Sequence, residues 1–214
     1  MILNAPAAFR NVDSSFGNNG SSPPTTPATP TVPGFHSDDY LYREAVQADG
    51  KIVVVGSVQH GDDFSGWDIA ITRCNPDGAL DSTFGVGGSR IVDLGGVEVP
   101  GGLALQGDRI VVSGATIGLQ DAGYHAVVLR LNADGSPDTT FQGSGQLIFD
   151  LGPGTLSTVE PHVAVFGDKA FVGSVDRGTE TGEDFAAVRL NRDGSLDTTF
   201  GDEACSLWTS VVRT

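Results

Sequence analysis

The sequence predicts an all-β protein made of repeated four-stranded antiparallel sheets, and three observations lead to this prediction. Two different motifs recur along the chain with nearly the same period. The predicted strands are apolar almost without interruption. The segments that join them are rich in glycine, aspartate and asparagine, and the chain holds 30 glycines among its 214 residues. Frequent tight turns of this composition indicate many short strands.

The first motif marks the end of each repeat. It reads NPDGALDSTFG, NADGSPDTTFQ and NRDGSLDTTFG, and its copies begin at Asn75, Asn132 and Asn191. The second motif lies upstream of the first. It reads AVQADGKIVVVGS, ALQGDRIVVSGA and AVFGDKAFVGS, with copies that begin at Ala45, Ala104 and Ala164. Two independent motifs with matching spacing establish an internal repeat.

One repeat contains four apolar segments. After Phe84 they read SRIVDLG, GGLALQ, RIVVSGAT and YHAVVLRLN. A strand exposed on one face alternates apolar and polar residues, whereas these segments are continuously apolar and must be buried on both faces. A single four-stranded sheet cannot cover its own two faces, so neighbouring copies have to do so. The prediction is a β-propeller-like array of about three blades that form an incomplete ring.

The repeat divides the chain into six segments. A partial copy, NVDSSFG, contains Asp13 and Phe16, and a stretch rich in proline, threonine and serine follows it. We expect the final segment to be an extra strand that pairs with the first blade and latches the ring. The segments are a partial repeat end (1–20), a linker (21–35), blade one without its first strand (36–84), blade two (85–141), blade three (142–200) and the extra strand (201–214).

These motifs resemble the bacterial delta-60 repeat family. The resemblance rests on ADGKIVVVG, on the strands that end in arginine and asparagine, and on turns such as DGSLDTTFG, and it covers residues 40–201 and the fragment at 9–20. It implies a propeller-like fold and an extracellular or cell-envelope setting, although the N-terminus carries no clear signal peptide. It implies no particular activity. Because closed propellers need about 4 to 8 blades, we expect further blades or a homo-oligomer.

The charge excludes one class of partner. The chain has 27 acidic and 12 basic residues, a formal net charge of −15. Nucleic-acid binding needs a basic surface, so we expect no nucleic-acid partner. No apolar run is long enough to span a membrane.

Polar residues at shared repeat positions are predicted to serve the fold. An arginine at a strand end can pair with the aspartate of the following turn. The alternative is a ring of charges around a ligand channel. The shared positions, with the phenylalanine that closes each motif, are Arg73, Arg130, Arg189, Asp77, Asp134, Asp193, Asp81, Asp138, Asp197, Phe84, Phe141 and Phe200.

Two aspartates are the weak candidates for a metal site. Asp93 and Asp150 share a repeat position, in IVDLG and IFDLG. If the strands that contain them line a central channel, their carboxylates face it, where Ca²⁺ could bind. The Asn-x-Asp-Gly turns need no ion, because Asx-turn hydrogen bonds explain them. We expect no resident cofactor, with Ca²⁺ as the alternative.

The sequence contains no nucleophile elbow, phosphate loop or dinucleotide fingerprint. We therefore expect a non-catalytic binding or scaffold module that presents loops 58–66, 116–123 and 175–183, which differ between repeats, to a protein or glycan ligand. The alternative is a propeller hydrolase, metal-dependent and lactonase-like, with a carboxylate site in the channel.

Overall fold

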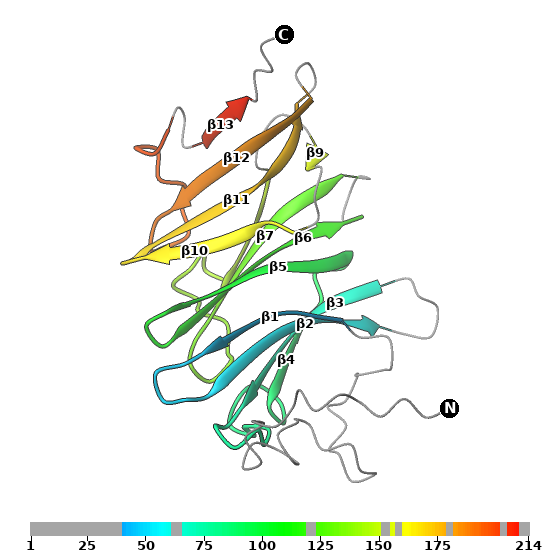
Figure 1. Ribbon diagram of the computed structural model, residues 1–214, viewed down its shortest axis with the longest axis vertical. Helices are drawn as coiled ribbons and strands as arrows, with labels where there is room; N and C mark the ends of the chain where they lie inside the picture. The colour runs from blue at the N-terminus through cyan, green and yellow to red at the C-terminus, as the bar shows by residue number, and fades with distance from the viewer. Residues whose placement is uncertain are drawn as a thin grey trace, which may run out of the picture.

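The structure is a computed structural model, and it describes residues 40–60, 66–118, 123–150, 155–156, 160–178, 182–201 and 205–209. The described residues form three antiparallel sheets, with no helix among them. The sheets follow one another along the long axis of the molecule (Figure 1). The all-β class and the repeated four-stranded sheet are confirmed. The predicted partial repeat end at 1–20 and the linker at 21–35 lie outside the described residues.

Each sheet is a meander in which consecutive strands are neighbours. The first sheet consists of β1 (Tyr40–Val46), β2 (Ile52–His60), β3 (Gly66–Cys74) and β4 (Ser89–Val92). The second consists of β5 (Val97–Gln106), β6 (Arg109–Ile117), β7 (Tyr124–Leu131) and β8 (Gln146–Phe149). The third consists of β10 (His162–Phe166), β11 (Lys169–Gly178), β12 (Gly182–Leu190) and β13 (Cys205–Thr209), and β9 (Thr155–Leu156) pairs with β11.

The sheets are offset by one strand from the predicted blades. The segment after Phe84 was expected to open the second blade, but as β4 it pairs with β3 and completes the first sheet. The segment after Phe141 likewise pairs with β7 as β8. The first blade therefore does not lack a strand. The final strand, β13, pairs with β12 and is not a latch on the first blade.

Local hydrogen bonds explain this offset. The backbone N–H of Asp81 donates to the carbonyl oxygen of Arg73 at 2.9 Å, and the N–H of Arg73 donates to the carbonyl oxygen of Gly88 at 2.9 Å. The turn motif therefore folds back onto the end of β3 and places the chain beyond Gly88 alongside that strand. Asp138, Arg130 and Gly145 make the same two bonds in the second sheet. A short connection of this kind favours pairing with the preceding strand.

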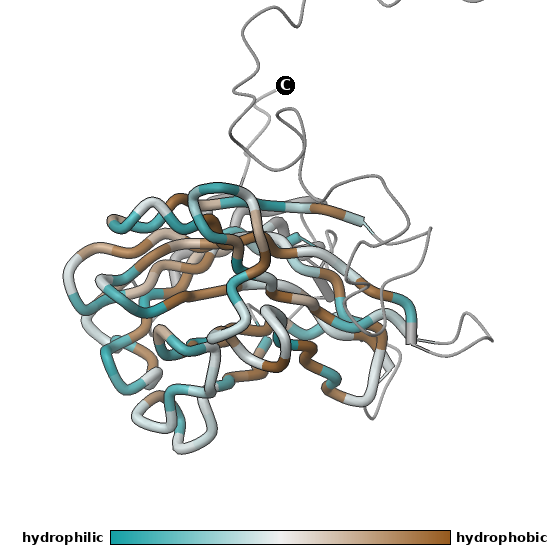
Figure 2. The backbone as a smooth tube through the Cα atoms, turned by 90° about the horizontal axis from the view of Figure 1, so that it is seen from below, coloured by the Kyte–Doolittle hydropathy of each residue, from teal (hydrophilic) through white to brown (hydrophobic). Residues whose placement is uncertain are grey.

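The middle sheet is buried on both faces, as its continuously apolar strands predict. Along β6, Ile110 and Val112 belong to the core between the first and second sheets, whereas Val111 and Ala115 belong to the core between the second and third. All four side chains are at most 1% exposed. Hydrophobic residues concentrate in the strands (Figure 2). Each pair of neighbouring sheets thus encloses a hydrophobic core that neither sheet could form alone.

The strands β1, β5 and β10 open their sheets and lie next to one another in the array (Figure 1). The strands β4, β8 and β13 lie at the opposite edge of each sheet. Among the described strands, no pairing joins one sheet to another, so this part of the chain forms three separate blades and no closed sheet.

Candidate functional site: the blade seams and an acidic cluster

The repeated arginine and aspartate form an ion pair in each blade, and the pair is buried in the first two. In the first blade, Arg73 Nε donates to Asp81 Oδ2 at 2.8 Å, and the guanidinium lies 4.8 Å from the centre of the Phe84 ring. The other oxygen of Asp81 accepts hydrogen bonds from the backbone N–H and the hydroxyl of Thr83, at 3.1 and 2.6 Å. Both carboxylate oxygens of Asp81 therefore have donors, as a buried charge requires.

The second and third blades repeat this arrangement. The arginine-to-aspartate distance is 2.8 Å in both, and a threonine two residues after the aspartate donates to its second oxygen. The participants are Arg130, Asp138, Thr140 and Phe141 in the second blade and Arg189, Asp197, Thr199 and Phe200 in the third. The side chains predicted to share a repeat position therefore make the same contacts in each blade.

A second cation reaches each of these aspartates from the preceding hairpin, and sequence reasoning missed it. Lys51 Nζ lies 2.9 Å from Asp81, Arg109 Nε lies 2.5 Å from Asp138, and Lys169 Nζ lies 3.2 Å from Asp197. A signal was present, since each cation directly follows a Gly-containing turn at the same repeat position and both lysines of the chain occupy it.

These contacts set the charge of the aspartates. Burial opposes ionisation of Asp138, but hydrogen bonds from Thr140 and the charge of Arg130 outweigh it and lower the pKa from 3.8 to about 2. Burial also opposes ionisation of Asp81, and hydrogen bonds from Thr83 and Lys51 hold its pKa well below the ordinary value. Thr199 is the main cause of the lowered pKa of Asp197. All three stay ionised at neutral pH.

The Asn-x-Asp-Gly turns are held by their own side chains. Asp77 Oδ1 accepts a hydrogen bond from Ala79 N at 3.0 Å, and Asp134 and Asp193 accept equivalent bonds from Ser136 and Ser195. This is the Asx-turn geometry that the sequence predicted. The glycine that follows has a positive φ in every copy, at 83°, 82° and 82° for Gly78, Gly135 and Gly194.

The turns of the second and third blades also receive the end of the preceding blade. Gly85 N donates to the carbonyl oxygen of Asp134 at 2.8 Å, and Arg73 Nη1 donates to the carbonyl oxygen of Ala133. A Cβ added to Gly135 would lie 3.0 Å from the Phe84 ring, so the ring lies directly on the glycine. Gln142, Arg130 and Phe141 contact the turn at 191–194 of the third blade in the same way. We call this set of contacts the blade seam.

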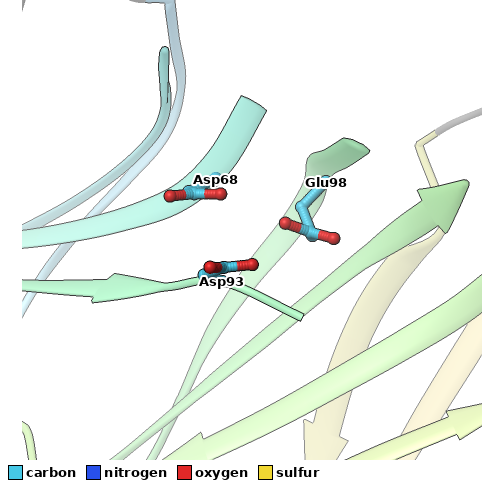
Figure 3. Close-up of side chains that lie close together, drawn as sticks. All are labelled: Asp68, Asp93 and Glu98. Carbon is cyan, nitrogen blue, oxygen red and sulfur yellow. The ribbon is translucent and has the colours of Figure 1, made fainter. Parts of the chain in front are cut away.

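An acidic cluster lies at the opposite ends of the strands. Asp68 is near the start of β3, Asp93 follows β4, and Glu98 is in β5. One carboxylate oxygen from each lies within 4.8 Å of the other two, and the three side chains converge between the first two sheets (Figure 3). Asp68 and Glu98 are buried, whereas Asp93 is exposed. The segments that differ between repeats join β2 to β3, β6 to β7 and β11 to β12, and the cluster lies at the ends of the strands that they connect.

Glu98 is the most constrained member of the cluster. Its Oε1 accepts hydrogen bonds from Gly96 N at 3.0 Å and Thr116 Oγ1 at 2.9 Å. Among the described residues its Oε2 has no hydrogen-bond partner, although the residue is fully buried. Burial raises the pKa of Glu98, and the neighbouring Asp68 charge raises it further.

Asp93 and Asp150 follow β4 and β8, at the sheet edge opposite to β1 and β5. The described strands close no ring, so the expectation that the two carboxylates face a channel stays a prediction. Asp93 Oδ1 accepts a hydrogen bond from Gly95 N at 2.7 Å, and Asp150 Oδ1 lies 2.7 Å from His125 Nδ1. Sequence reasoning missed Asp68 and Glu98, although the repeat offered a signal, since Asp184 of the third repeat aligns with Asp68 and Asp39 of the first aligns with Glu98.

The fold and the seams define a β-propeller-type repeat protein. Three segments of the chain, 47–84, 106–141 and 171–200, match the model of a family described as a β-propeller domain of unknown function (DUF5122). These three matches identify β-propeller repeats in the chain, in agreement with the delta-60 resemblance. A search of the curated proteins finds no match. Within the described residues, no helix has the length and apolar character needed to cross a membrane.

Proposed function

We propose that the chain is a non-catalytic scaffold module that takes up a further blade through the outer face of its third sheet. The observation that carries this proposal is the solvent exposure of the Arg189 side chain. The side chains of Arg73 and Arg130 are 6% and 3% exposed, because the next blade covers them, whereas that of Arg189 is 26% exposed. Arg189 is nevertheless fully arranged, with Asp197 at 2.8 Å and the Phe200 ring at 5.0 Å.

The third blade therefore presents one half of a blade seam. In the two complete seams, the arginine Nη1 donates to a carbonyl oxygen of the next Asn-x-Asp-Gly turn. In the described part of the chain, no such carbonyl faces Arg189. Chemistry identifies the occupant as a turn of the same kind, with a free carbonyl oxygen and a glycine on which Phe200 can lie. A further blade of this family, from the same polypeptide or from another molecule, supplies both.

The repeated charges support a scaffold in preference to an enzyme. The arginines and aspartates of the closing motif take part in a turn or a seam, so their side chains already serve the fold. The rival lactonase-like hydrolase needs a carboxylate site in the channel, and Asp93 and Asp150 lie at the other sheet edge. We also propose that a protein or glycan ligand binds at the strand ends that the differing loops connect. An extracellular or cell-envelope setting belongs to the same proposal and rests on the family resemblance alone.

A chain extended by one blade tests the proposal. A second copy of residues 150–209 is joined after Thr209, and Arg189→Ala is made in the natural and in the extended chain. We expect the substitution to lower the free energy of unfolding by about 3 kcal/mol in the extended chain, where it leaves a buried aspartate short of a partner. In the natural chain the expected loss is below about 1 kcal/mol.

Leu196→Ala serves as the control, because Leu196 is 45% exposed on the same turn. It should cost the same small amount in both chains. An equal cost of Arg189→Ala in the two chains would show that the outer face of the third sheet does not receive a blade. Turnover of an ester or lactone panel by the natural chain would count against the non-catalytic part of the proposal.

A further inference from the structure

The place where the chain crosses from the first sheet to the second holds three carboxylates from three different segments. Asp68 comes from β3, Asp93 from the end of β4 and Glu98 from the start of β5 (Figure 3). Their nearest oxygens all lie within 4.8 Å of one another. Two of the three residues are almost completely buried, with exposed fractions of 2% for Asp68 and 0% for Glu98. Like charges held this close in a buried place repel strongly unless a positive charge offsets them.

A separate observation at Glu98 indicates that the cluster binds a ligand. Glu98 Oε1 accepts two hydrogen bonds, but Oε2 has no partner among the described residues even though the side chain is fully buried. The carboxylate group of Glu98 lies toward Asp68 and Asp93 (Figure 3). Buried carboxylate oxygens in folded proteins nearly always have a hydrogen-bond donor or a cation beside them. An unpartnered oxygen in this cluster therefore points to a cation.

The second blade shows what the same place looks like when the chain supplies its own nitrogen donor. The repeat places His125 where the first blade has Asp68, and Asp150 where it has Asp93. There the imidazole Nδ1 lies 2.7 Å from the Asp150 carboxylate. In the first blade Asp68 stands in place of the imidazole, so this position holds a third carboxylate group beside Asp93 and Glu98.

We propose that Asp68, Asp93 and Glu98 bind a divalent cation, and that this cation is Ca²⁺. The donor set contains only carboxylate oxygens, which Ca²⁺ prefers and which suit Zn²⁺ or Cu²⁺ less well. With Ca–O distances of about 2.4 Å, two ligands on opposite sides of the ion are about 4.8 Å apart. The separations in the cluster fall within that span. Exposed Asp93 leaves a side from which the ion and its remaining water ligands enter.

The bound ion would join the first two blades at the strand ends opposite to the blade seam. Asp68 belongs to the first sheet, Glu98 belongs to the second, and Asp93 lies in the connection between them. Gly96 allows this approach, because a Cβ there would lie 2.3 Å from the carbonyl oxygen of Ile117. The inference concerns a structural metal site and is independent of the proposed uptake of a further blade.

Calorimetric titration of the chelator-treated full chain with CaCl₂ tests the site. We expect one Ca²⁺ per chain, and a thermal unfolding midpoint that rises with the Ca²⁺ concentration, because an ion that binds only the folded state stabilises it. Asp93→Asn should weaken Ca²⁺ binding at least tenfold, and Glu98→Gln should abolish the calcium-dependent rise of the midpoint. The matched control is Asp150→Asn, at the same repeat position in the second blade, and its Ca²⁺ affinity should stay within twofold of the natural chain.

Because Asp93 is exposed, Asp93→Asn should fold and still test the site if Glu98→Gln fails to fold. The proposal is overturned if CaCl₂ gives neither heat nor a shift of the midpoint up to about 10 mM, which exceeds the dissociation constants of about 0.1 to 1 mM known for weak extracellular calcium modules. It is also overturned if Asp93→Asn and Asp150→Asn weaken binding equally, since that result would mean diffuse attraction to an acidic protein. If Glu98 instead shares a proton with its neighbours, Ca²⁺ binding will be absent and the first of these results will be seen.

Discussion

The side chain of Arg130 in the second sheet donates a hydrogen bond of 2.5 Å to the backbone carbonyl oxygen of Arg192 in the third. The same guanidinium pairs with Asp138 and lies 4.8 Å from the centre of the Phe141 ring. One residue thus holds its own turn closed and attaches that turn to the next blade. Four predictions test how far the stability of the array depends on such seams and on the apolar residues beneath them.

Loss of a covered seam arginine should be costly. Arg130→Ala leaves Asp138 buried with one of its two cations missing, and the carbonyl oxygen of Arg192 without its donor. We expect the free energy of unfolding, measured by urea denaturation, to fall by about 3 kcal/mol. The conservative variant Arg130→Lys should recover only part of this loss, because a lysine cannot form the forked contact. A loss below about 1 kcal/mol would mean that the seam bonds are solvent-screened pairs.

Gly135 should not tolerate a side chain. Its φ is +82°, and a Cβ would lie 2.9 Å from Gly85 N and 3.0 Å from the Phe84 ring. Gly135→Ala should therefore combine a backbone penalty of about 1 to 2 kcal/mol with the separation of two blades. Gly107→Ala is the control, because its φ is +61° and nothing lies within 4 Å of the added atom. Equal losses of unfolding free energy in the two variants would refute a close seam contact at Gly135.

The seams should weaken in acid. The folded pKa of Asp138 is about 2, below its ordinary value of 3.8. The unfolded chain therefore takes up a proton first as the pH falls, so the stability from this carboxylate is complete above about pH 4 and is lost between about pH 4 and pH 2. The lowered pKa values of Asp81 and Asp197 act in the same direction. We expect the urea midpoint to fall over this range, and to fall less in Asp138→Asn. If the urea midpoint of Asp138→Asn falls with pH as steeply as that of the natural chain, Asp138 is not a source of the acid sensitivity.

The core between the first two sheets should be sensitive to small cavities. Val112 is fully buried there, so Val112→Ala should lower the free energy of unfolding by about 2 kcal/mol. Val86→Ala is the matched control, because Val86 is 82% exposed, and it should change stability by less than about 0.5 kcal/mol. Similar losses in the two valine variants would show that the second sheet does not cover the first.

Much of the fold could be predicted because the relevant interactions are local or repeated. The Asn-x-Asp-Gly turns, the pairing of Arg73 with Asp81, and the two-sided burial of β6 follow from patterns within a few residues or from a constant period. The assignment of strands to sheets was wrong by one strand. A repeat fixes only the spacing of the strands, and its starting point is arbitrary until hydrogen bonds such as that from Arg73 N to Gly88 O decide which neighbour a strand joins.

The acidic cluster shows the limit of sequence reasoning more clearly. Asp93 was a candidate, but its partners Asp68 and Glu98 were not found, because they come together only where two sheets meet. The sequence by itself determined an all-β chain of repeated four-stranded blades with self-supporting turns, since local hydrogen bonds and the burial pattern of each strand act over short distances. Only the tertiary structure decided which strand completes each blade, which face is left with an uncovered arginine and which carboxylates converge. The first outcome depends on which of several possible hydrogen bonds form at the end of a strand, and the other two depend on packing between different blades.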